Sequence, residues 1–296
     1  MIDGPPLLSV IVPAWNREET IVRAVESLRS QTLTNFEVVV VDNGSTDATI
    51  SRVRSMSDER LRIVSLPENV GPSAARNAGA ALARGTYLGF LDSDDEVEPE
   101  WAASLVATFD DPRFAVACCG YHSTRGGDVL PADLGRAFGP FVGRFQAGAF
   151  ILRRDVFELV GGYVDRLWYG ENTEFALRVT AWCVENNRDI ASIPRVLMRW
   201  HQGPLGRYDD ALDRRMESAL YTAEHHRAQL ARDPVLLASH YAIAGRCSYR
   251  LGDFRGATNH YRTAVACTPK NKHYRAWMVA SGLRSLAPVK IRKRKM

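Results

Sequence analysis

A cluster of carboxylates follows an apolar segment near residue 90. The segment Tyr87–Phe90 is aromatic and apolar, which is typical of a buried strand, and Leu91–Asp95 (LDSDD) follows it with three acidic residues in four positions. Because burying carboxylates is costly, they must lie where the strand leaves the core. Carboxylate oxygens suit a hard divalent cation, and such a cation suits a phosphate-bearing substrate. An acidic loop that caps a helix opening at Pro99 and Glu100 is the plainer alternative.

Polar residues also follow two other predicted strands. Leu7–Pro13 predicts a first buried strand, and Asn16 lies in the loop after it. Phe36–Val41 predicts a second strand, which Asp42 ends. An Asn-Gly turn follows Asp42, and we expect Ser45 or Thr46 to cap a helix beginning near Ala48.

A fourth set of polar residues opens a helix rich in small residues. This helix is predicted from Ala74 to Ala83, and Pro72 fits its first position. Arg76 lies in its first turns, near an N-terminus that favours anions. Ligands bind at the carboxyl ends of parallel strands, so Asp42 and Arg76 become candidate neighbours of the acidic cluster.

The order of these elements predicts the fold class. In the first ~95 residues strands and helices alternate, beginning and ending with a strand. This order implies a mostly parallel α/β sheet with right-handed crossovers. We expect a helix from Pro99 to Phe109 that buries Trp101, an extended segment at Gln146–Leu152 and a strand at Ile190–Leu197. Residues 122–145 predict a loop that could shape an acceptor site.

Composition limits the class of protein. The 296 residues are 46% hydrophobic and 24% charged, which is typical of a globular protein with a real core. The net charge is +4, and five positive charges lie in the tail Lys290–Lys295, so the body carries no excess that would favour nucleic acid. We expect a cytoplasmic protein without a spanning segment, which the tail could hold at the inner, anionic face of a membrane.

The chain changes character near Tyr208, where β-branched runs give way to helical patterns. One helix-turn-helix unit resembles a single tetratricopeptide repeat, although Ser248 stands where an aromatic is expected. We therefore predict a catalytic domain at 1–207, a helical appendage at 208–287 that could support a homodimer, and a basic tail at 288–296. The repeat-like positions are Tyr241, Ala244, Gly245, Gly252, Ala257, Tyr261, Ala264 and Pro269.

Taken together, the motifs of residues 7–205 resemble glycosyltransferase family 2, whose members are inverting enzymes with the GT-A fold. No single motif is specific, but the ordered set is. The matching pieces are Pro13–Asn16, Val41–Asp47, Asn69–Gly71 with Ala75–Asn77, Leu91–Asp95, Gly170–Asn172 with Glu174 and Phe175, and His201.

This resemblance implies a nucleotide-sugar donor, with UDP favoured over dTDP, and a hydroxyl acceptor. Asp42 would accept the imide N–H of uracil or thymine. Asp94 would bind Mn²⁺ or Mg²⁺, which neutralises the departing diphosphate, and His201 would close over the metal. Asp95 would lie behind them. The other implied donor-site residues are Pro13, Ala14 and Asn16 around the nucleotide, Arg76 near its phosphates, and Asp92 and Ser93 at the ribose.

Each of these residues also has a plainer reading. Asp42 could cap a helix and Asn16 could form a loop turn. Arg76 could be a solvated helix residue, and a lone histidine such as His201 is more often structural.

The sequence departs from the family pattern at Asn172. The family has Glu-Asp here, with the aspartate as general base, whereas this chain has Glu171 and Asn172. Either Glu171 or Glu174 takes over as base, or transfer activity is lost, since base catalysis contributes about 10²–10⁴-fold. We favour Glu171. The rival function is a catalytically silent nucleotide-sugar-binding or scaffold protein. The acceptor is not encoded in a readable motif, and a glycan, a cell-surface polysaccharide and a natural product are all compatible.

Overall fold

The computed structural model describes residues 4–202 and 211–286. The chain divides into two compact units, Met1–Pro204 and Leu205–Met296. The basic tail at 288–296 lies outside the described residues. No helix within the described ranges is long and apolar enough to cross a membrane.

The first unit is built on one mixed sheet. Among the described residues, nine strands form this sheet in the order β3-β2-β1-β4-β10-β6-β11-β5, with β7 paired to β6, and β8 pairs with β9 separately. The first four strands of that order are mutually parallel, β10 is antiparallel to both its neighbours, and β11 is parallel to β6. The strands are β1 Leu8–Ala14, β2 Phe36–Asn43, β3 Leu61–Leu66, β4 Tyr87–Phe90, β5 Glu96–Val97, β6 Phe114–Ser123, β7 Gly127–Val129, β8 Ala132–Asp133, β9 Val142–Gly143, β10 Phe150–Arg153 and β11 Asp189–Trp200.

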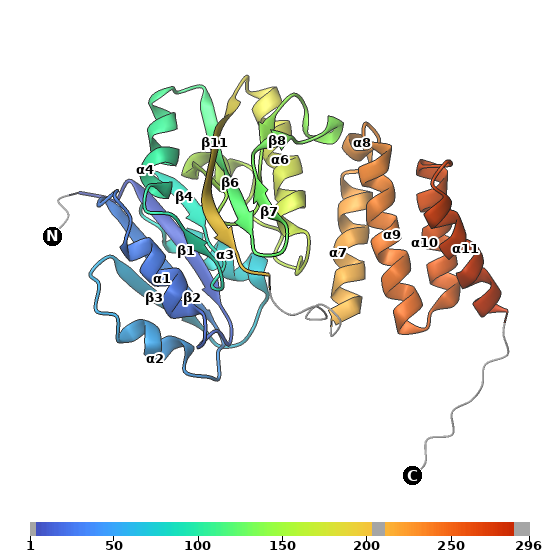
Figure 1. The fold of residues 1–296 in the computed structure, drawn as a ribbon, viewed down its shortest axis with the longest axis horizontal. Coiled ribbons are helices and arrows are strands. Elements are labelled where there is room, and N and C mark those ends of the chain that lie inside the picture. Colours follow the sequence, from blue (N-terminus) through green and yellow to red (C-terminus); the bar gives the residue numbers. More distant parts are fainter. Residues whose placement is uncertain (1–3, 203–210, 287–296) are drawn as a thin grey trace, which may run out of the picture. The chain divides into compact units, whose positions relative to one another are not determined.

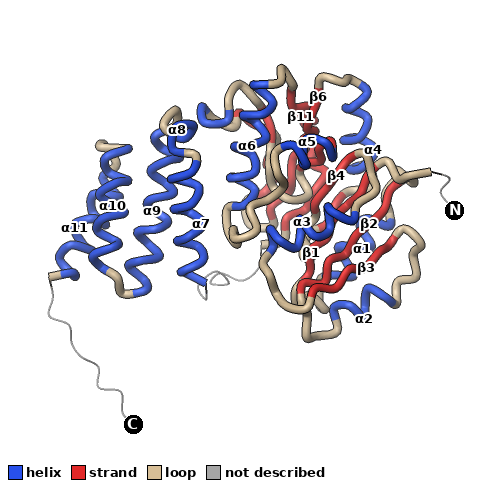
Figure 2. Tube along the Cα trace, turned by 180° about the vertical axis from the view of Figure 1, so that it is seen from behind, coloured by secondary structure: helices blue, strands red, loops and turns tan. Residues whose placement is uncertain are grey.

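Helices cover both faces of this sheet, as predicted (Figures 1 and 2). Alternate residues of β1 point to opposite faces: Val10 packs in the core with α1 and α4, whereas Ile11 lies against Gly79 of α3. The helices of this unit are α1 Ile21–Arg29, α2 Thr49–Arg54, α3 Pro72–Leu82, α4 Trp101–Val106, α5 Arg154–Leu159 and α6 Glu171–Glu185.

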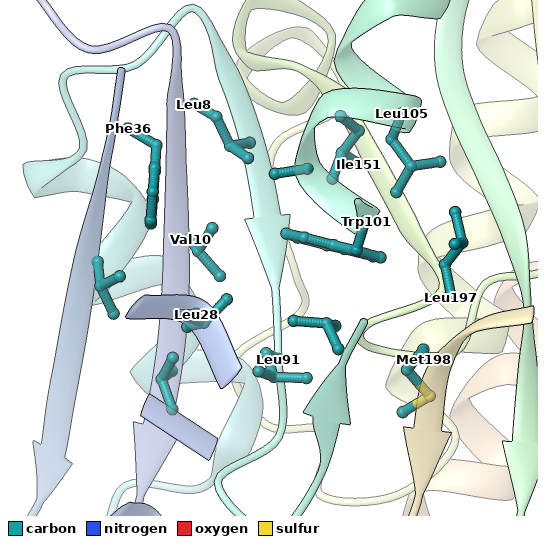
Figure 3. Packing of buried hydrophobic residues seen from close by; sticks show 14 of the residues in the cluster. Leu8, Val10, Leu28, Phe36, Leu91, Trp101, Leu105, Ile151, Leu197 and Met198 are labelled. Atoms are coloured by element: carbon teal, nitrogen blue, oxygen red, sulfur yellow. The ribbon is translucent and has the colours of Figure 1, made fainter. Parts of the chain in front are cut away.

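Trp101 anchors the core beneath the acidic loop (Figure 3). Its side chain is fully buried, and its indole N–H donates to the carbonyl of Gly148 at 2.7 Å. Gly148 adopts a positive φ of 87°, and a Cβ there would meet Met198 at 2.8 Å. The segment before β10 is thus a tight turn that closes on β4 and on the tryptophan.

Some boundaries differ from the sequence expectation. The helix expected from Pro99 begins at Trp101 and continues from Ala107 to Asp110 as a 3₁₀ helix. The extended segment expected at Gln146–Leu152 begins as a turn, in which the amide of Ala149 donates to Gln146, so β10 starts only at Phe150. The 122–145 region carries the short strands β7, β8 and β9 and a 3₁₀ turn at Arg136–Phe138.

The second unit is helical. It contains α7 Leu212–His225, α8 Arg227–Leu230, α9 Pro234–Leu251, α10 Phe254–Cys267 and α11 Lys272–Ser285. Asp233, Asp253 and Asn271 cap α9, α10 and α11 through side-chain oxygens, which fixes where each helix begins. Gly245 of α9 lets the ring of Tyr261 in α10 approach closely, since a Cβ there would lie 2.9 Å from it.

Candidate functional site

The parallel strands bring the polar segments expected after β1, β2 and β4 to one edge of the sheet. Ala14 at the end of β1 is the register partner of Asp42 in β2, and Ile11 of β1 is the partner of Phe90, the last residue of β4. Because these strands are parallel, the loops after all three leave the same edge, where ligands of such sheets bind. Asp42 and Leu91–Asp95 are therefore neighbours in the fold.

The loops after β1 and β2 are joined by reciprocal hydrogen bonds. Asn16 has a positive φ of 51°; its side-chain oxygen accepts from the amide of Thr46 at 2.9 Å, and its own amide donates to the hydroxyl of Ser45. Glu18 accepts from the amide of Ala48 at 3.0 Å. Asn16 thus forms a turn in the loop after β1. Pro13 and Ala14 lead into this loop as part of β1.

The turn after β2 differs from the expected one. Neither Ser45 nor Thr46 is the capping residue of α2 in the described chain; the N-cap position is Ala48, and Asp47 accepts from the amide of Thr49 at 2.9 Å. Asp42 instead accepts from the amide of Ser45 at 2.9 Å, three residues on, which closes the turn after β2. Its buried carboxylate is therefore held in one orientation at the end of the strand.

Asn43 fastens the neighbouring loop, although the sequence analysis gave it no role. Its amide nitrogen donates to the side-chain oxygen of Asn69 at 2.9 Å, and its amide oxygen accepts from the backbone of Val70 at 3.0 Å. Gly44 is required here, because a Cβ would lie 2.6 Å from the backbone of Glu68. These contacts place the start of α3 beside the end of β2.

Arg76 of α3 is the centre of the charged cluster. Its side chain is only 2% exposed, and its two terminal nitrogens bind different carboxylates: Asp92 at 2.6 Å and Glu171 at 2.9 Å. Burial alone would lower the pKa of Arg76, but these two carboxylates raise it overall, so the guanidinium stays charged. Its Nε is buried without a hydrogen-bond partner among the described residues. The alternative of a solvated arginine is wrong.

The acidic loop divides into residues of different character. Asp92 and Asp94 are partly exposed, Asp94 with 21% of its side chain, and Asp94 forms a long ion pair of 3.8 Å with Arg17. Ser93 and Asp95 are buried. Burial, together with the Asp92 and Asp94 carboxylates, raises the pKa of Asp95 to about 9, although the amide of His201 opposes the shift. This environment favours the protonated form of Asp95.

His201, at the end of β11, is bound to this loop at two points. Its amide donates to Asp95 at 2.8 Å, and its Nε2 lies 2.6 Å from the carboxylate of Glu96. Glu96 also pairs with Arg23 of α1 at 3.0 Å. The imidazole is therefore engaged by Glu96, a residue that the sequence analysis passed over. In this arrangement His201 ties β11 to the acidic loop.

The start of α6 gives its three candidate catalytic residues different environments. Glu171 is the first residue of the helix and faces Arg76. Asn172 accepts a hydrogen bond at 2.9 Å from the buried hydroxyl of Tyr163. Glu174 is buried and forms a two-pronged pair with Arg178 at 2.8 and 2.7 Å. Glu174 therefore braces the helix and is not placed to meet an acceptor.

The acidic loop could supply one or two carboxylate ligands to a divalent cation, but not a complete coordination shell. No group of three or more histidine, cysteine or acidic side chains in the described ranges could enclose a metal ion. Mg²⁺ and Mn²⁺ in phosphate-transfer sites are, however, held by one or two carboxylates, and substrate phosphates and water complete the shell. The partly exposed carboxylate of Asp94, with its long ion pair, matches that kind of ligand.

Two residues at the site could not have been found from local patterns. Tyr163 packs against Phe175 with ring centroids 4.5 Å apart and also lies beneath Arg76. Asn77 holds the Tyr163 backbone through two hydrogen bonds, of 2.7 and 2.9 Å. The only available signal was the match of Ala75–Asn77 to a family motif, which gave Asn77 no role.

Comparison with known proteins decides the family. A family model described as "Glycosyl transferase family 2" matches residues 9–162, which is just over half of the chain. The chain belongs to glycosyl transferase family 2. The matched region contains both the acidic loop and Arg76, and it ends shortly before α6.

Curated relatives match part of this family 2 chain. The succinoglycan biosynthesis protein ExoO of Rhizobium meliloti (strain 1021) is 44% identical over 109 residues, which is 37% of this chain and 31% of that protein. The matched part spans about a third of the length of the first curated relatives.

Solved structures share the fold over nearly the whole chain. S. aureus TarS 1-349 in complex with UDP-GlcNAc has a TM-score of 0.69 at 20% identity, covering 93% of this chain and 88% of that one. The mannosyltransferase PcManGT from Pyrobaculum calidifontis, in complex with GDP-Man and Mn²⁺, has a TM-score of 0.60 at 20% identity, covering 96% and 86%. At such identities the likeness concerns the fold alone, and it confirms the predicted GT-A-like architecture followed by helices.

Proposed function

We propose that this family 2 protein is an inverting glycosyltransferase that moves a sugar from a UDP- or dTDP-sugar to an acceptor hydroxyl in glycan, cell-surface polysaccharide or natural-product biosynthesis. The observation that carries the proposal is Arg76. This buried side chain binds Asp92 of the acidic loop and Glu171 of α6, and so joins the proposed donor segment to the segment where a base is needed. The succinoglycan role in the name of ExoO supports a polysaccharide product.

Asp42 would select the nucleotide base. The hydrogen bond from the amide of Ser45 would hold its carboxylate at the end of β2, where it could accept the imide N–H of uracil or thymine. The UDP-GlcNAc bound to TarS supports this donor class. PcManGT binds GDP-Man on the same fold, so the choice of base rests on Asp42 and its loop and not on the architecture.

Asp94 would hold Mn²⁺ or Mg²⁺ against the donor diphosphate, and Asp92 would contact the ribose. When bound, the cation neutralises charge on the departing nucleoside diphosphate. His201 would keep the loop in place from the β11 side, because it contacts Asp95 of the loop and Glu96, the first residue of β5. Arg76 adds a permanent positive charge behind Asp92.

Glu171 would be the general base. It would accept the proton of the acceptor hydroxyl while that oxygen attacks the anomeric carbon; the bond from that carbon to the diphosphate oxygen breaks, and the configuration inverts. Asn172 cannot take this role, because its amide has no useful basicity. Glu174 is buried against Arg178.

The substitution Glu171→Gln tests this assignment. It keeps the shape and a hydrogen-bond acceptor for Arg76 but removes the base, so we expect kcat to fall about 10²–10⁴-fold. Calorimetry with UDP and Mn²⁺ should show donor-product binding little changed. Glu185→Gln at the exposed end of the same helix is the matched control. An unchanged kcat in Glu171→Gln would refute the role of Glu171 as base.

The scaffold alternative is favoured by one contact. Asn172 is held by the Tyr163 hydroxyl, so it has a packing role that needs no catalysis. An aspartate at position 172 would accept the same hydrogen bond, and Asn172→Asp should therefore fold. A large gain in donor hydrolysis in Asn172→Asp would favour a degenerate site, whereas a loss would favour a site organised around Asn172.

We further infer that the second unit is related to a tetratricopeptide repeat. The α9–α10 pair buries the repeat-like small residues Ala244, Ala257 and Ala264. Ser248, which replaces the expected aromatic, is buried and contacts Met216 of α7 at 3.1 Å. The neighbouring helix thus fills the space that a larger side chain would occupy.

A further inference from the structure

Charge is distributed very unevenly along this chain. Residues 254–296 contain eleven lysines and arginines and no aspartate or glutamate, and all five lysines of the protein lie after residue 269. The segment includes two described helices, α10 and α11. A run of 43 residues without one acidic side chain has no internal partner for its positive charge. An anionic surface would complement this charge.

The described basic residues of this segment all face solvent. Six lie on α10, on α11 or in the turn between them, and each is exposed. Ion pairs with carboxylates within the segment are excluded by its composition. The six residues are Arg255, Arg262, Lys270, Lys272, Arg275 and Arg284.

One face of α11 is apolar as well as exposed. Val279, Leu283 and Leu286 are 55%, 66% and 82% exposed. Their spacing of four and then three residues places them on one side of the helix and its C-terminal residue. Lys272 and Arg275 share this side by the same spacing, so a basic half precedes the apolar half. Ser281, on the opposite side, is the buried residue of α11.

We propose that this face of α11 binds the surface of an anionic lipid bilayer. Apolar side chains that insert at the acyl boundary, flanked by cations that contact lipid phosphates, form the two signals that peripheral attachment needs. Lys290, Arg292, Lys293, Arg294 and Lys295 extend the charge beyond Leu286 in the sequence. A nucleic acid or anionic polysaccharide would use the cations but would leave the three apolar side chains exposed.

The test is sedimentation of the full-length protein with vesicles. Vesicles of equal parts phosphatidylcholine and phosphatidylglycerol should pellet the protein, and pure phosphatidylcholine should not. Replacing Val279, Leu283 and Leu286 together by serine should weaken binding at least about tenfold. Lys272→Gln with Arg275→Gln should weaken it about fivefold for each charge and make the remainder less sensitive to salt.

Matched controls distinguish binding by this surface from nonspecific binding through exposed side chains elsewhere. Leu159→Ser, Val184→Ser and Val235→Ser remove three apolar side chains of similar exposure, 67%, 57% and 69%, from other helices. Arg52→Gln with Arg54→Gln removes two exposed charges from α2. Both controls should bind vesicles as the parent does. Because all substituted residues are exposed, circular dichroism and thermal unfolding should be unchanged in every variant.

Three results would overturn the proposal. The first is equal vesicle binding by the two triple-serine variants. The second is binding to single-stranded DNA or dextran sulfate with none to anionic vesicles. The third is a dimer, seen by light scattering, that dissociates when Val279, Leu283 and Leu286 are substituted. That result would show that the apolar face of α11 binds a second copy of the chain. UDP binding in solution is a separate readout, so failure here leaves the proposed transferase function untouched.

Discussion

A single guanidinium holds together two segments of the candidate site, the acidic loop and the start of α6, that are far apart in the sequence. Arg76 reaches Glu171 and Asp92 with separate nitrogens, which only a planar, forked cation can do. Lysine at this position would keep the charge but could not bind both carboxylates in the same geometry. The role of the residue therefore depends on shape as well as on charge.

We expect Arg76→Lys to lower kcat/KM by about a hundredfold, equivalent to about 3 kcal/mol of transition-state stabilisation. Glu171 and Asp92 would lose their common anchor, so both base placement and donor contact should suffer. Steady-state kinetics with a nucleotide-sugar that the parent protein uses as donor measures the effect. Arg52→Lys, at an exposed position of α2, is the control. Parent-like kinetics in Arg76→Lys would show that the bridge has no catalytic importance.

His240 gives the helical unit a predicted sensitivity to acid. Its ring is buried in α9, and neither ring nitrogen has a hydrogen-bond partner in the described part of the chain. Burial, with His226 adding to the effect, lowers the pKa of His240 to about 4 from an unfolded value near 6.5. The unfolded state therefore binds a proton more readily. This stability contribution is complete above pH 6.5 and is lost as the pH falls toward 4.

Lowering the pH from 7.5 to 5 should reduce the free energy of unfolding of the helical unit by about 2 kcal/mol through protonation of His240. His240→Phe should reduce the pH dependence of urea unfolding by that amount, while exposed His273→Phe should not. If His240→Phe has the same pH dependence as the parent, protonation of His240 does not control acid unfolding.

At the scale of elements, the position of α3 depends on one glycine. A Cβ at Gly79 would lie 2.5 Å from Ile11 and 2.8 Å from Val41, both on the sheet. Any larger residue must push α3 away from β1 and β2. Because Arg76 is one turn earlier on the same helix, that movement would reach the site.

We expect Gly79→Ala to destabilise the first unit by about 1–3 kcal/mol and to reduce transfer activity. Gly282→Ala in α11 is the matched control, because a Cβ there would meet its nearest neighbour only at 3.9 Å. Alanine is the better helix former, so the control should stabilise its unit by up to about 1 kcal/mol. Denaturant unfolding of both variants decides; destabilisation of similar size in both would contradict the packing argument.

The sequence predicted the secondary-structure elements better than it predicted strand order and side-chain pairings. Continuous apolar runs such as Phe36–Val41 identify buried parallel strands, and β1, β2 and β4 follow that prediction. The insertion of β10 between β4 and β6 could not be predicted, because strand order depends on long-range pairing. For the same reason the pairing of His201 with Glu96 was missed, whereas Arg76 was found through its motif but without its partner Glu171.

At the scale of the molecule, the residues proposed for catalysis all belong to the first unit. A chain ending after residue 210 should therefore bind UDP and Mn²⁺ with nearly the affinity of the full chain. Calorimetry on both proteins measures this. A truncated chain that unfolds as cooperatively as the first unit of the parent but binds no UDP would show that the donor site needs the helical unit.

The reciprocal bonds between the loops after β1 and β2 have a consequence for hydrogen exchange. The amides of Asn16, Arg17 and Glu18 donate to side chains of the second loop, and those of Thr46 and Ala48 donate back to Asn16 and Glu18. Ligand-binding loops commonly exchange their amide protons quickly, because their backbone is open to water. These five amides should be protected before any nucleotide arrives, so we expect the two loops of the proposed nucleotide site to be ordered without a ligand.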